Sequence, residues 1–182
     1  MKEIKLSNKV IITDPCYGIQ DYPNPHTKLV LDNVKEGIYN VNVLYSDEGV
    51  WGKRVAALEV INKQNDLSGT NLRMIDRLET VGSVCVDSGQ MSISDYNYYK
   101  TLCNVIGEID DSWYDVFCAL TLSADQFGTI DNSSAVSRTG YGDGDYEVVV
   151  GYWNKEIVYI SVRFIVEDEE EDDEFEDCDD EE

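Results

Sequence analysis

An alternation of apolar and polar residues along much of the chain predicts β-strands. In residues 37–45, every second side chain from Tyr39 onward is a tyrosine or a valine, so one face of this strand is expected to be buried. A second apolar run, residues 54–61, follows a loop that contains two glycines. Together the two runs predict a β-hairpin with one face toward water.

A second hairpin is predicted at residues 146–166, directly before the acidic C-terminal residues. Residues 146–152 are rich in valine, Asn154 and Lys155 suit a tight turn, and residues 157–166 form the returning apolar run. Earlier in the chain, residues 81–86 predict a buried strand that ends at a polar loop. The sequence is therefore dominated by antiparallel strand signals.

Apolar residues within residues 94–127 recur at the three- and four-residue spacing of helices. One or two short helices are expected there, with an N-cap within residues 110–112. The fold class that follows is mainly β, or β-rich α+β. We expect an antiparallel sandwich or curled barrel that carries one or two short helices.

Length and composition limit the chain to one domain. Its 182 residues, of which 42% are hydrophobic, suffice for a single core. The last sixteen residues contain fourteen carboxylates, one Phe and one Cys, too little apolar surface to offset the entropy of ordering them. We therefore expect one β-rich domain at residues 1–166 and a disordered acidic tail at residues 167–182.

Net charge narrows the range of partners. The body holds 23 of the acidic residues and all 14 Lys and Arg, so it carries −9 and the acidic tail carries −14. Such a charge repels nucleic-acid phosphates and anionic lipids, so neither direct nucleic-acid binding nor membrane binding is expected. A protein with a basic surface is the favoured partner, although an acidic tail also serves simply to keep a protein soluble.

Cysteine and histidine content argues against several site chemistries. Five cysteines occur without a Cys-x-x-Cys pair, and the chain has one histidine, so neither a disulfide framework nor a zinc site is expected. The N-terminal residues lack the apolar run of a signal peptide, and no eighteen consecutive residues are apolar. These features favour a cytoplasmic protein.

No catalytic residue is assigned from the sequence. Ser88 lacks the Gly-x-Ser-x-Gly elbow, and His26 lies in a proline-bounded loop. Cys16 has no neighbouring cation in the sequence to lower its pKa. Whether the protein is an enzyme therefore stays open.

Polar and glycine-rich loops next to the predicted strands carry the candidate ligand-binding residues. These candidates are Asp14, Asp87, Ser88, Gln90, Arg138, Tyr141, Asp143 and Asp145. The glycines of residues 137–146 allow the backbone to approach a ligand closely. An arginine suits an anion, and clustered aspartates suit Mg²⁺ or Ca²⁺.

Ordinary turn chemistry explains the same residues, because Asp and Ser in turns bond nearby backbone N–H groups. The two interpretations differ in geometry. If the strands before Asp87 and after Asp143 are antiparallel neighbours, both carboxylates lie at one edge of a sheet. Convergence of these two with Arg138 and Asp145 in one concave pocket would favour a ligand site.

Two motifs are moderately specific as a pair: Val-Asp-Ser-Gly at 86–89 followed by Asp95, and Gly-Asp-Gly-Asp-Tyr at 142–146. The strand pair at 37–60 is a third segment of the same set. With them the chain resembles an uncharacterised domain family of bacteria and their phages, over most of residues 10–166. The resemblance implies a shared fold and a shared loop site, and it supplies no reaction. The acidic tail is not expected of the family.

The leading expectation is a non-catalytic cytoplasmic binding protein, consistent with a phage origin, that acts on a host or partner protein. The alternative is a protein that binds a small anionic ligand, such as a nucleotide or a metal-bound phosphate, or a metal-dependent hydrolase. Either would use the loops of Asp87 and Asp143 with a divalent cation. A further alternative is an acidic mimic of nucleic acid. No cofactor is assigned.

Overall fold

A computed structural model of the chain, which describes residues 2–19, 26–67, 72–106 and 112–166, is built mostly from β-strands. The strands are β1 Lys2–Leu6, β2 Lys9–Thr13, β3 Lys28–Asp32, β4 Gly37–Asp47, β5 Lys53–Asn62, β6 Asp66–Leu67, β7 Leu72–Arg73, β8 Arg77–Val86, β9 Gln90–Asp95, β10 Phe127–Ile130, β11 Ser134–Arg138, β12 Gly144–Trp153 and β13 Glu156–Arg163. The helical elements are η1 Gly49–Trp51, α1 Tyr96–Ile106 and α2 Ser112–Thr121.

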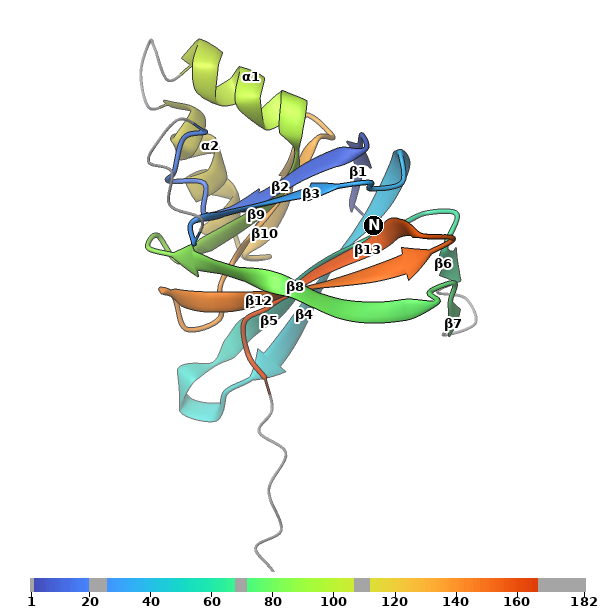
Figure 1. The fold of residues 1–182 in the computed structure, drawn as a ribbon. Helices are drawn as coiled ribbons and strands as arrows, with labels where there is room; N and C mark the ends of the chain where they lie inside the picture. Colours follow the sequence, from blue (N-terminus) through green and yellow to red (C-terminus); the bar gives the residue numbers. More distant parts are fainter. Residues whose placement is uncertain (1, 20–25, 68–71, 107–111, 167–182) are drawn as a thin grey trace, which may run out of the picture.

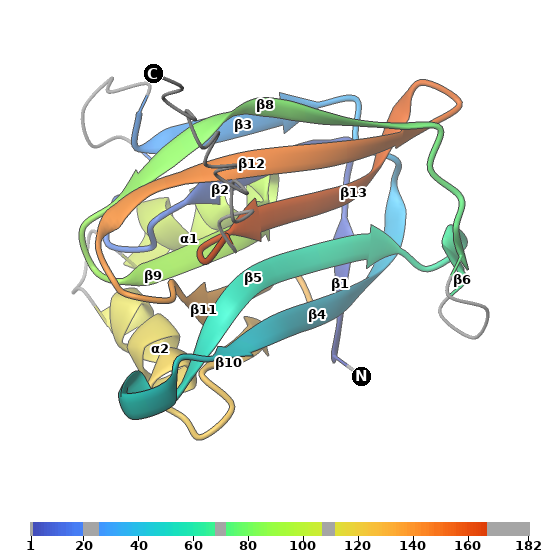
Figure 2. The same ribbon diagram turned by 90° about the horizontal axis from the view of Figure 1, so that it is seen from below.

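Two antiparallel sheets form the body (Figure 1). The larger has the strand order β1-β4-β5-β13-β12-β8 and the smaller has β10-β11-β9-β2-β3, while β6 and β7 make a separate short pair. Helices α1 and α2 pack against the smaller sheet, on the side away from the larger one (Figures 1 and 2). The prediction of a mainly β antiparallel sandwich or curled barrel with one or two short helices is confirmed, as two separate sheets with the two helices α1 and α2.

Single backbone hydrogen bonds connect the edges of the two sheets. The N–H of Lys5 in β1 donates to the carbonyl of Asn132, between β10 and β11, at 2.6 Å. On the other side, the N–H of Cys85 in β8 donates to the carbonyl of His26, before β3, also at 2.6 Å. The sheets therefore meet at both edges and remain two separate sheets.

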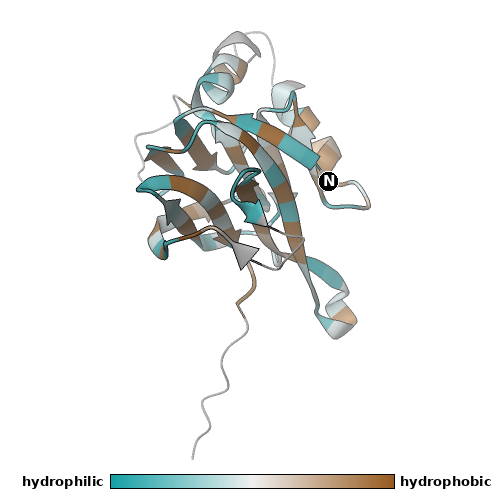
Figure 3. Cartoon of the chain, turned by 90° about the vertical axis from the view of Figure 1, so that its right-hand side faces the viewer, coloured by the Kyte–Doolittle hydropathy of each residue, from teal (hydrophilic) through white to brown (hydrophobic). Residues whose placement is uncertain are grey.

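The main core lies between the sheets. Tyr39, Val41 and Val43 of β4 point into it, whereas Ile38 and Leu44 on the other face are 47% and 50% exposed. This alternation along the strands is visible as bands of hydrophobic and hydrophilic colour in Figure 3. The hairpin predicted from the alternating pattern is confirmed as β4 and β5, with the predicted face buried.

A second core lies between the smaller sheet and the helices. Ile11 and Val136 of the sheet meet Tyr99 of α1 and Trp113 and Phe117 of α2. The rings of Tyr99 and Phe117 lie edge-on to Trp113, with centroids 6.1 and 5.8 Å away. Such edge-to-face packing adds to the stabilisation from burial, so the aromatics of this region hold the helices on the sheet.

The ends of the helices show one cap that the sequence analysis did not assign. Oδ1 of Asp95 accepts hydrogen bonds from the N–H groups of Asn97 and Tyr98, both at 3.0 Å, and so caps the start of α1. The cap predicted within residues 110–112 falls largely outside the described residues, as does the acidic tail predicted to be disordered. Among the described residues, neither helix has the length and apolar character needed to span a membrane.

Candidate functional site

A buried carboxylate joins two of the loops that the sequence singled out. Asp14, directly after β2, is fully buried. Its Oδ2 accepts hydrogen bonds from the N–H groups of Asp87 and Ser88 at 2.8 and 2.7 Å. Its Oδ1 accepts from the N–H of Cys16 at 2.9 Å and from Oγ of Ser88 at 2.5 Å. Four hydrogen bonds satisfy this charge and fix the loop after β8 against the loop after β2.

The residues around Asp14 extend the same network. The hydroxyl of Tyr17 donates to the carboxylate of Asp87, and the hydroxyl of Tyr99 in α1 donates to the carbonyl of Tyr17 at 2.8 Å. Burial, together with the negative charge of Asp14, raises the pKa of Cys16 to about 12. The Cys16 thiol therefore stays protonated near neutral pH, as a structural cysteine does.

Strands β8 and β12 bring the two candidate loops to one edge of the larger sheet. They are antiparallel neighbours, and Gly144 lies opposite Val86. The N–H of Thr139 donates to the carbonyl of Gly89 at 3.1 Å. Gly89 has a φ of +67°, and a Cβ placed on it would lie 3.5 Å from Cα of Gly142. The loops after β8 and before β12 are thus in contact, which is the arrangement expected for Asp87 and Asp143.

A cavity of about 250 Å³ opens between these loops, the start of β5 and the end of α2. Its lining residues are Arg54, Ser88, Gly89, Gln90, Cys118, Thr121, Leu122, Arg138, Thr139, Gly140, Tyr141 and Gly142. Both arginines contribute positive charge, and none of the described residues that line the cavity is a carboxylate. We refer to it as the arginine pocket.

Arg54 is held on three sides. Its Nη1 donates to the carbonyl of Gly140 at 2.9 Å, and its guanidinium lies 5.1 Å from the ring centroid of Tyr141 and 5.9 Å from that of Trp51. The hydroxyls of Ser46 and Tyr141 both donate to the carboxylate of Glu48. The bond from Ser46 first, then the bond from Tyr141 and the charge of Arg54, lower the pKa of Glu48. Nε of Arg54 is buried and has no hydrogen-bond partner within the described part of the chain.

Gln90 lines the arginine pocket, and hydrogen bonds fix the orientation of its amide. Its Nε2 donates to the hydroxyl of Tyr114 at 3.0 Å, and its Oε1 accepts from Oγ1 of Thr121 at 3.1 Å. Both partners belong to α2. Gln90 itself is only 6% exposed, so the helix sets which end of the amide faces each neighbour.

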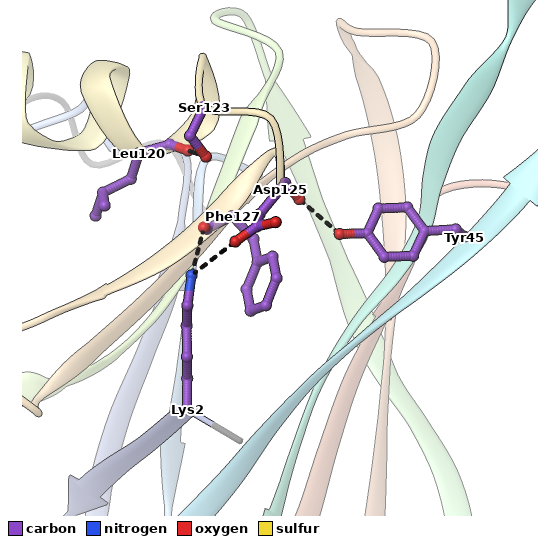
Figure 4. A network of polar contacts seen from close by, with 6 residues as sticks. All are labelled: Lys2, Tyr45, Leu120, Ser123, Asp125 and Phe127. Carbon is purple, nitrogen blue, oxygen red and sulfur yellow. Dashed lines mark hydrogen bonds and ion pairs between the residues drawn. The ribbon is translucent and has the colours of Figure 1, made fainter.

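The segment after α2 is tied to the larger sheet, which fixes the helix at the pocket (Figure 4). Nζ of Lys2 in β1 donates to the carbonyl of Phe127 at 3.0 Å and lies 3.8 Å from the carboxylate of Asp125. The hydroxyl of Tyr45 in β4 donates to the carbonyl of Asp125 at 2.6 Å. These contacts join strands from one sheet to the connection that leads into the other.

The structure divides the predicted site residues into two groups. Ser88, Gln90, Arg138 and Tyr141 line the arginine pocket. The four aspartates lie outside its lining: Asp14 and Asp87 serve the loop network, Asp145 accepts from Oγ of Ser83 at 2.9 Å, and Asp143 is exposed. Among the described residues, no three His, Cys, Asp or Glu side chains group as a metal site would require.

Sequence reasoning missed Arg54, Cys118, Thr121 and Leu122, which complete the pocket. Arg54 meets Gly140 across 86 positions of sequence. The sequence gives only a slight indication that Arg54 belongs to a site. It is a charged residue near the start of an apolar run, three residues after Trp51. The helix residues gave no signal beyond the helical spacing itself.

Comparison with known protein families identifies the sequence family of the chain. A family model with the description "Protein of unknown function (DUF4241)" matches residues 5–162. The chain belongs to this family. The resemblance to a domain family of unknown function is thereby confirmed, and the family supplies no activity. No curated protein and no solved structure matches the chain.

Proposed function

We propose that the protein binds a small anion, with a phosphate or carboxylate group, in the arginine pocket. The observation that carries the proposal is the presence of two arginines, Arg54 and Arg138, in the lining of one cavity, neither with an ion-pair partner among the described residues. Guanidinium groups bind oxyanions through charge-assisted hydrogen bonds. An oxyanion in the pocket would supply the negative partner that both arginines lack among these residues.

The chemistry of the lining supports an oxyanion. A guanidinium presents its N–H donors in a planar fork that matches carboxylate and phosphate oxygens. Arg138 adds a second positive charge, and neither arginine forms an ion pair with a described residue. The Tyr141 ring and the Gly140 carbonyl hold Arg54 in place before a ligand arrives, so less conformational entropy is lost on binding.

The size of the pocket limits the ligand. At about 250 Å³, it lies at or below the lower end of the volumes typical of drug-sized ligands. A phosphate group, or a compact di- or tricarboxylate, fits this scale. Because the lining residues that the structure describes include no carboxylate, the geometry favours direct binding by arginine over the cation-bridged phosphate considered for Asp87 and Asp143.

The test is a titration of the full chain with inorganic phosphate and, separately, with citrate. We expect saturable shifts of the Arg Nε–H and Gly140 amide signals in NMR spectra. Arg138→Gln should weaken the Kd by about tenfold, because it removes one charge-assisted contact. Lys155→Gln, at the far end of β12, removes the same charge and should leave the Kd unchanged.

Two results would refute the proposal. One is the absence of any saturable shift with either anion. The other is an equal loss of affinity in Arg138→Gln and Lys155→Gln, which would mean that the anion responds only to net charge.

The charge of the chain supports a second proposal, an interaction with a partner protein. The fourteen carboxylates of the acidic tail favour a cytoplasmic partner with a basic surface. The same charge underlies the nucleic-acid mimic considered from the sequence, and both stay predictions, as does a phage origin. A pull-down from cell extract should enrich basic proteins, and this enrichment should fall as salt rises. If the protein retained a purified oligonucleotide at physiological salt, this would contradict the electrostatic argument against direct nucleic-acid binding.

A further inference from the structure

We propose that the arginine pocket binds a phosphate monoester whose organic group carries a planar aromatic ring, as a nucleoside monophosphate does. The ring stacks on Trp51, beside the pocket. This inference rests on the proposed function, because it assigns the rest of the ligand to the same site. Three observations support it: the exposed apolar side chains around the pocket, the contact of Trp51 with Arg54, and the match between two arginines and one phosphate.

Exposed apolar side chains lie around the arginine pocket. Leu122 and Tyr141 line it, and both are exposed, Leu122 to 77%. Trp51 belongs to η1, at the projecting end of the β4–β5 hairpin (Figure 1), and it is 68% exposed next to the exposed Val50. Single exposed apolar residues are ordinary, whereas several beside one cavity are typical of a binding site. We refer to these four residues as the apolar rim.

Trp51 is in contact with a charge that would hold the phosphate. Its ring centroid lies 5.9 Å from Cζ of Arg54, and Nη1 of Arg54 donates to the carbonyl of Gly140 at 2.9 Å. The carbonyl of Lys53 accepts from Nε2 of Gln126 at 3.3 Å, so the start of β5 is held against the segment that follows α2. A phosphate bonded to Arg54 therefore has the exposed indole within reach of its organic group.

The volume of the pocket separates the two parts of the ligand. At about 250 Å³, it accommodates a group of the size of a phosphate, and the rest of a larger ligand extends out through the mouth. The apolar rim is what the organic group meets there. A planar ring stacks on an exposed indole because both have extended π faces, and the contact removes apolar surface from water on each side.

The charge of the site favours one phosphate over several. A phosphate monoester carries a charge between about −1.5 and −2 at pH 7, which the guanidinium groups of Arg54 and Arg138 balance. Neither arginine has an ion-pair partner within the described ranges. Additional phosphates would extend away from these arginines into the field of a chain whose net charge is −23. A monophosphate is therefore favoured over a triphosphate.

The experiment measures Kd values for the full chain by isothermal titration calorimetry. The ligands are inorganic phosphate, ribose 5-phosphate, which lacks an aromatic base, and adenosine monophosphate. We expect the nucleotide to bind at least about tenfold more tightly than ribose 5-phosphate, a gain of the size that one stacked base provides. Adenosine, which lacks the phosphate, should bind at least about tenfold more weakly than the nucleotide. Adenosine triphosphate should bind no more tightly than the monophosphate.

Trp51→Ala tests where the ring lies. The ratio of the Kd of ribose 5-phosphate to that of adenosine monophosphate should fall below about twofold, because the stacking partner is lost. Using this ratio cancels any effect of the substitution on Arg54, which both ligands contact. Trp51→Phe keeps a ring and should preserve most of the ratio. Trp153→Ala is the matched control and should leave the ratio unchanged, because Trp153 ends β12 at the opposite end from Gly144.

The outcomes separate this inference from the proposed function. Saturable binding of inorganic phosphate and ribose 5-phosphate, with no gain from the base, refutes the ring contact and leaves the proposed function intact. The absence of saturable binding of any phosphate refutes both proposals, as does adenosine that binds as tightly as its monophosphate. A gain that persists in Trp51→Ala places the ring elsewhere and refutes the inference. A triphosphate that binds at least about tenfold more tightly than the monophosphate overturns the assignment to a monoester.

Two further results would assign the apolar rim to another occupant and so contradict the inference. One is a dimer of the ligand-free chain, seen by sedimentation velocity, that dissociates in Trp51→Ala, because a second copy would then cover the rim. The other is a short phosphotyrosine peptide that binds more tightly than adenosine monophosphate and loses this advantage in Trp51→Ala, which would assign the site to a partner protein.

Discussion

Asp14 and Arg54 are both charged side chains in the neighbourhood of the same loops, and they differ in how many of their polar atoms have partners. The Asp14 carboxylate is fully buried and accepts four hydrogen bonds from the loops on either side. The Arg54 guanidinium donates one hydrogen bond to Gly140, and its buried Nε has no partner among the described residues.

The proposed anion site rests on this difference in hydrogen bonding between the two charged side chains. Removing an ion from water costs several kcal/mol, and only complete hydrogen bonding offsets that cost. Asp14 meets this condition within the protein, and it holds the two loops together. Arg54 does not meet it among the described residues, and this is why the proposed anion site is placed at Arg54.

The strongest test of the comparison is Asp14→Ala. The substitution leaves the N–H groups of Cys16, Asp87 and Ser88 without their acceptor inside the protein. We expect the free energy of unfolding, measured by urea denaturation, to fall by about 3–5 kcal/mol. Asp32→Ala is the control, because the Asp32 side chain is 76% exposed in its ion pair with Lys9.

The control should change the free energy of unfolding by less than about 0.5 kcal/mol. An equally small change in Asp14→Ala would mean that water replaces the lost carboxylate at little cost. The loop network would then not depend on Asp14, and the distinction from Arg54 would fail.

The sequence predicted some strands of the fold and missed others. The first hairpin was predicted because β4 alternates between apolar and polar residues, and the second because two apolar runs flank a tight turn at Asn154 and Lys155. Strand β9 was missed, since its alternate positions are serines and it was assigned partly to a loop and partly to a helix. Ser92 and Ser94 are fully buried, with Oγ of Ser92 donating to the carbonyl of Thr13 at 2.9 Å. A polarity pattern cannot register burial that depends on a distant partner.

Part of the candidate site was also indicated by the sequence. The glycine-rich loop before β12 drew attention to Arg138 and Tyr141, and both line the arginine pocket, because such loops collect at the ends of strands. Aspartates were the stronger sequence signal, yet Asp14, Asp87 and Asp145 bond within the protein. Turn chemistry, the competing explanation for these residues, fits Asp14 and its neighbours.

A smaller effect on stability is expected for Arg54→Gln. The substitution loses the hydrogen bond to Gly140 and the contact with the Tyr141 ring, and it also removes a buried donor that lacks a partner among the described residues. These effects partly cancel, so unfolding should become easier by only about 1 kcal/mol. A loss as large as that of Asp14→Ala, measured by the same denaturation, would make Arg54 a structural residue.

The smallest effect is expected for Tyr17→Phe, which removes only the hydroxyl that donates to Asp87 at the outer side of the loop network. One exposed hydrogen bond contributes about 0.5 kcal/mol to the free energy of unfolding.

The bond to Asp87, with burial, raises the pKa of Tyr17 above its usual value. The contribution is therefore complete below the pKa of tyrosine in the unfolded chain, about 10, and is lost as the pH rises through the higher pKa of the folded state. Urea denaturation of both chains at pH 7 and at progressively alkaline pH should show their difference narrowing only above about pH 10. A difference that is constant up to the most alkaline condition at which both fold would show that the hydroxyl acts through packing and not through Asp87.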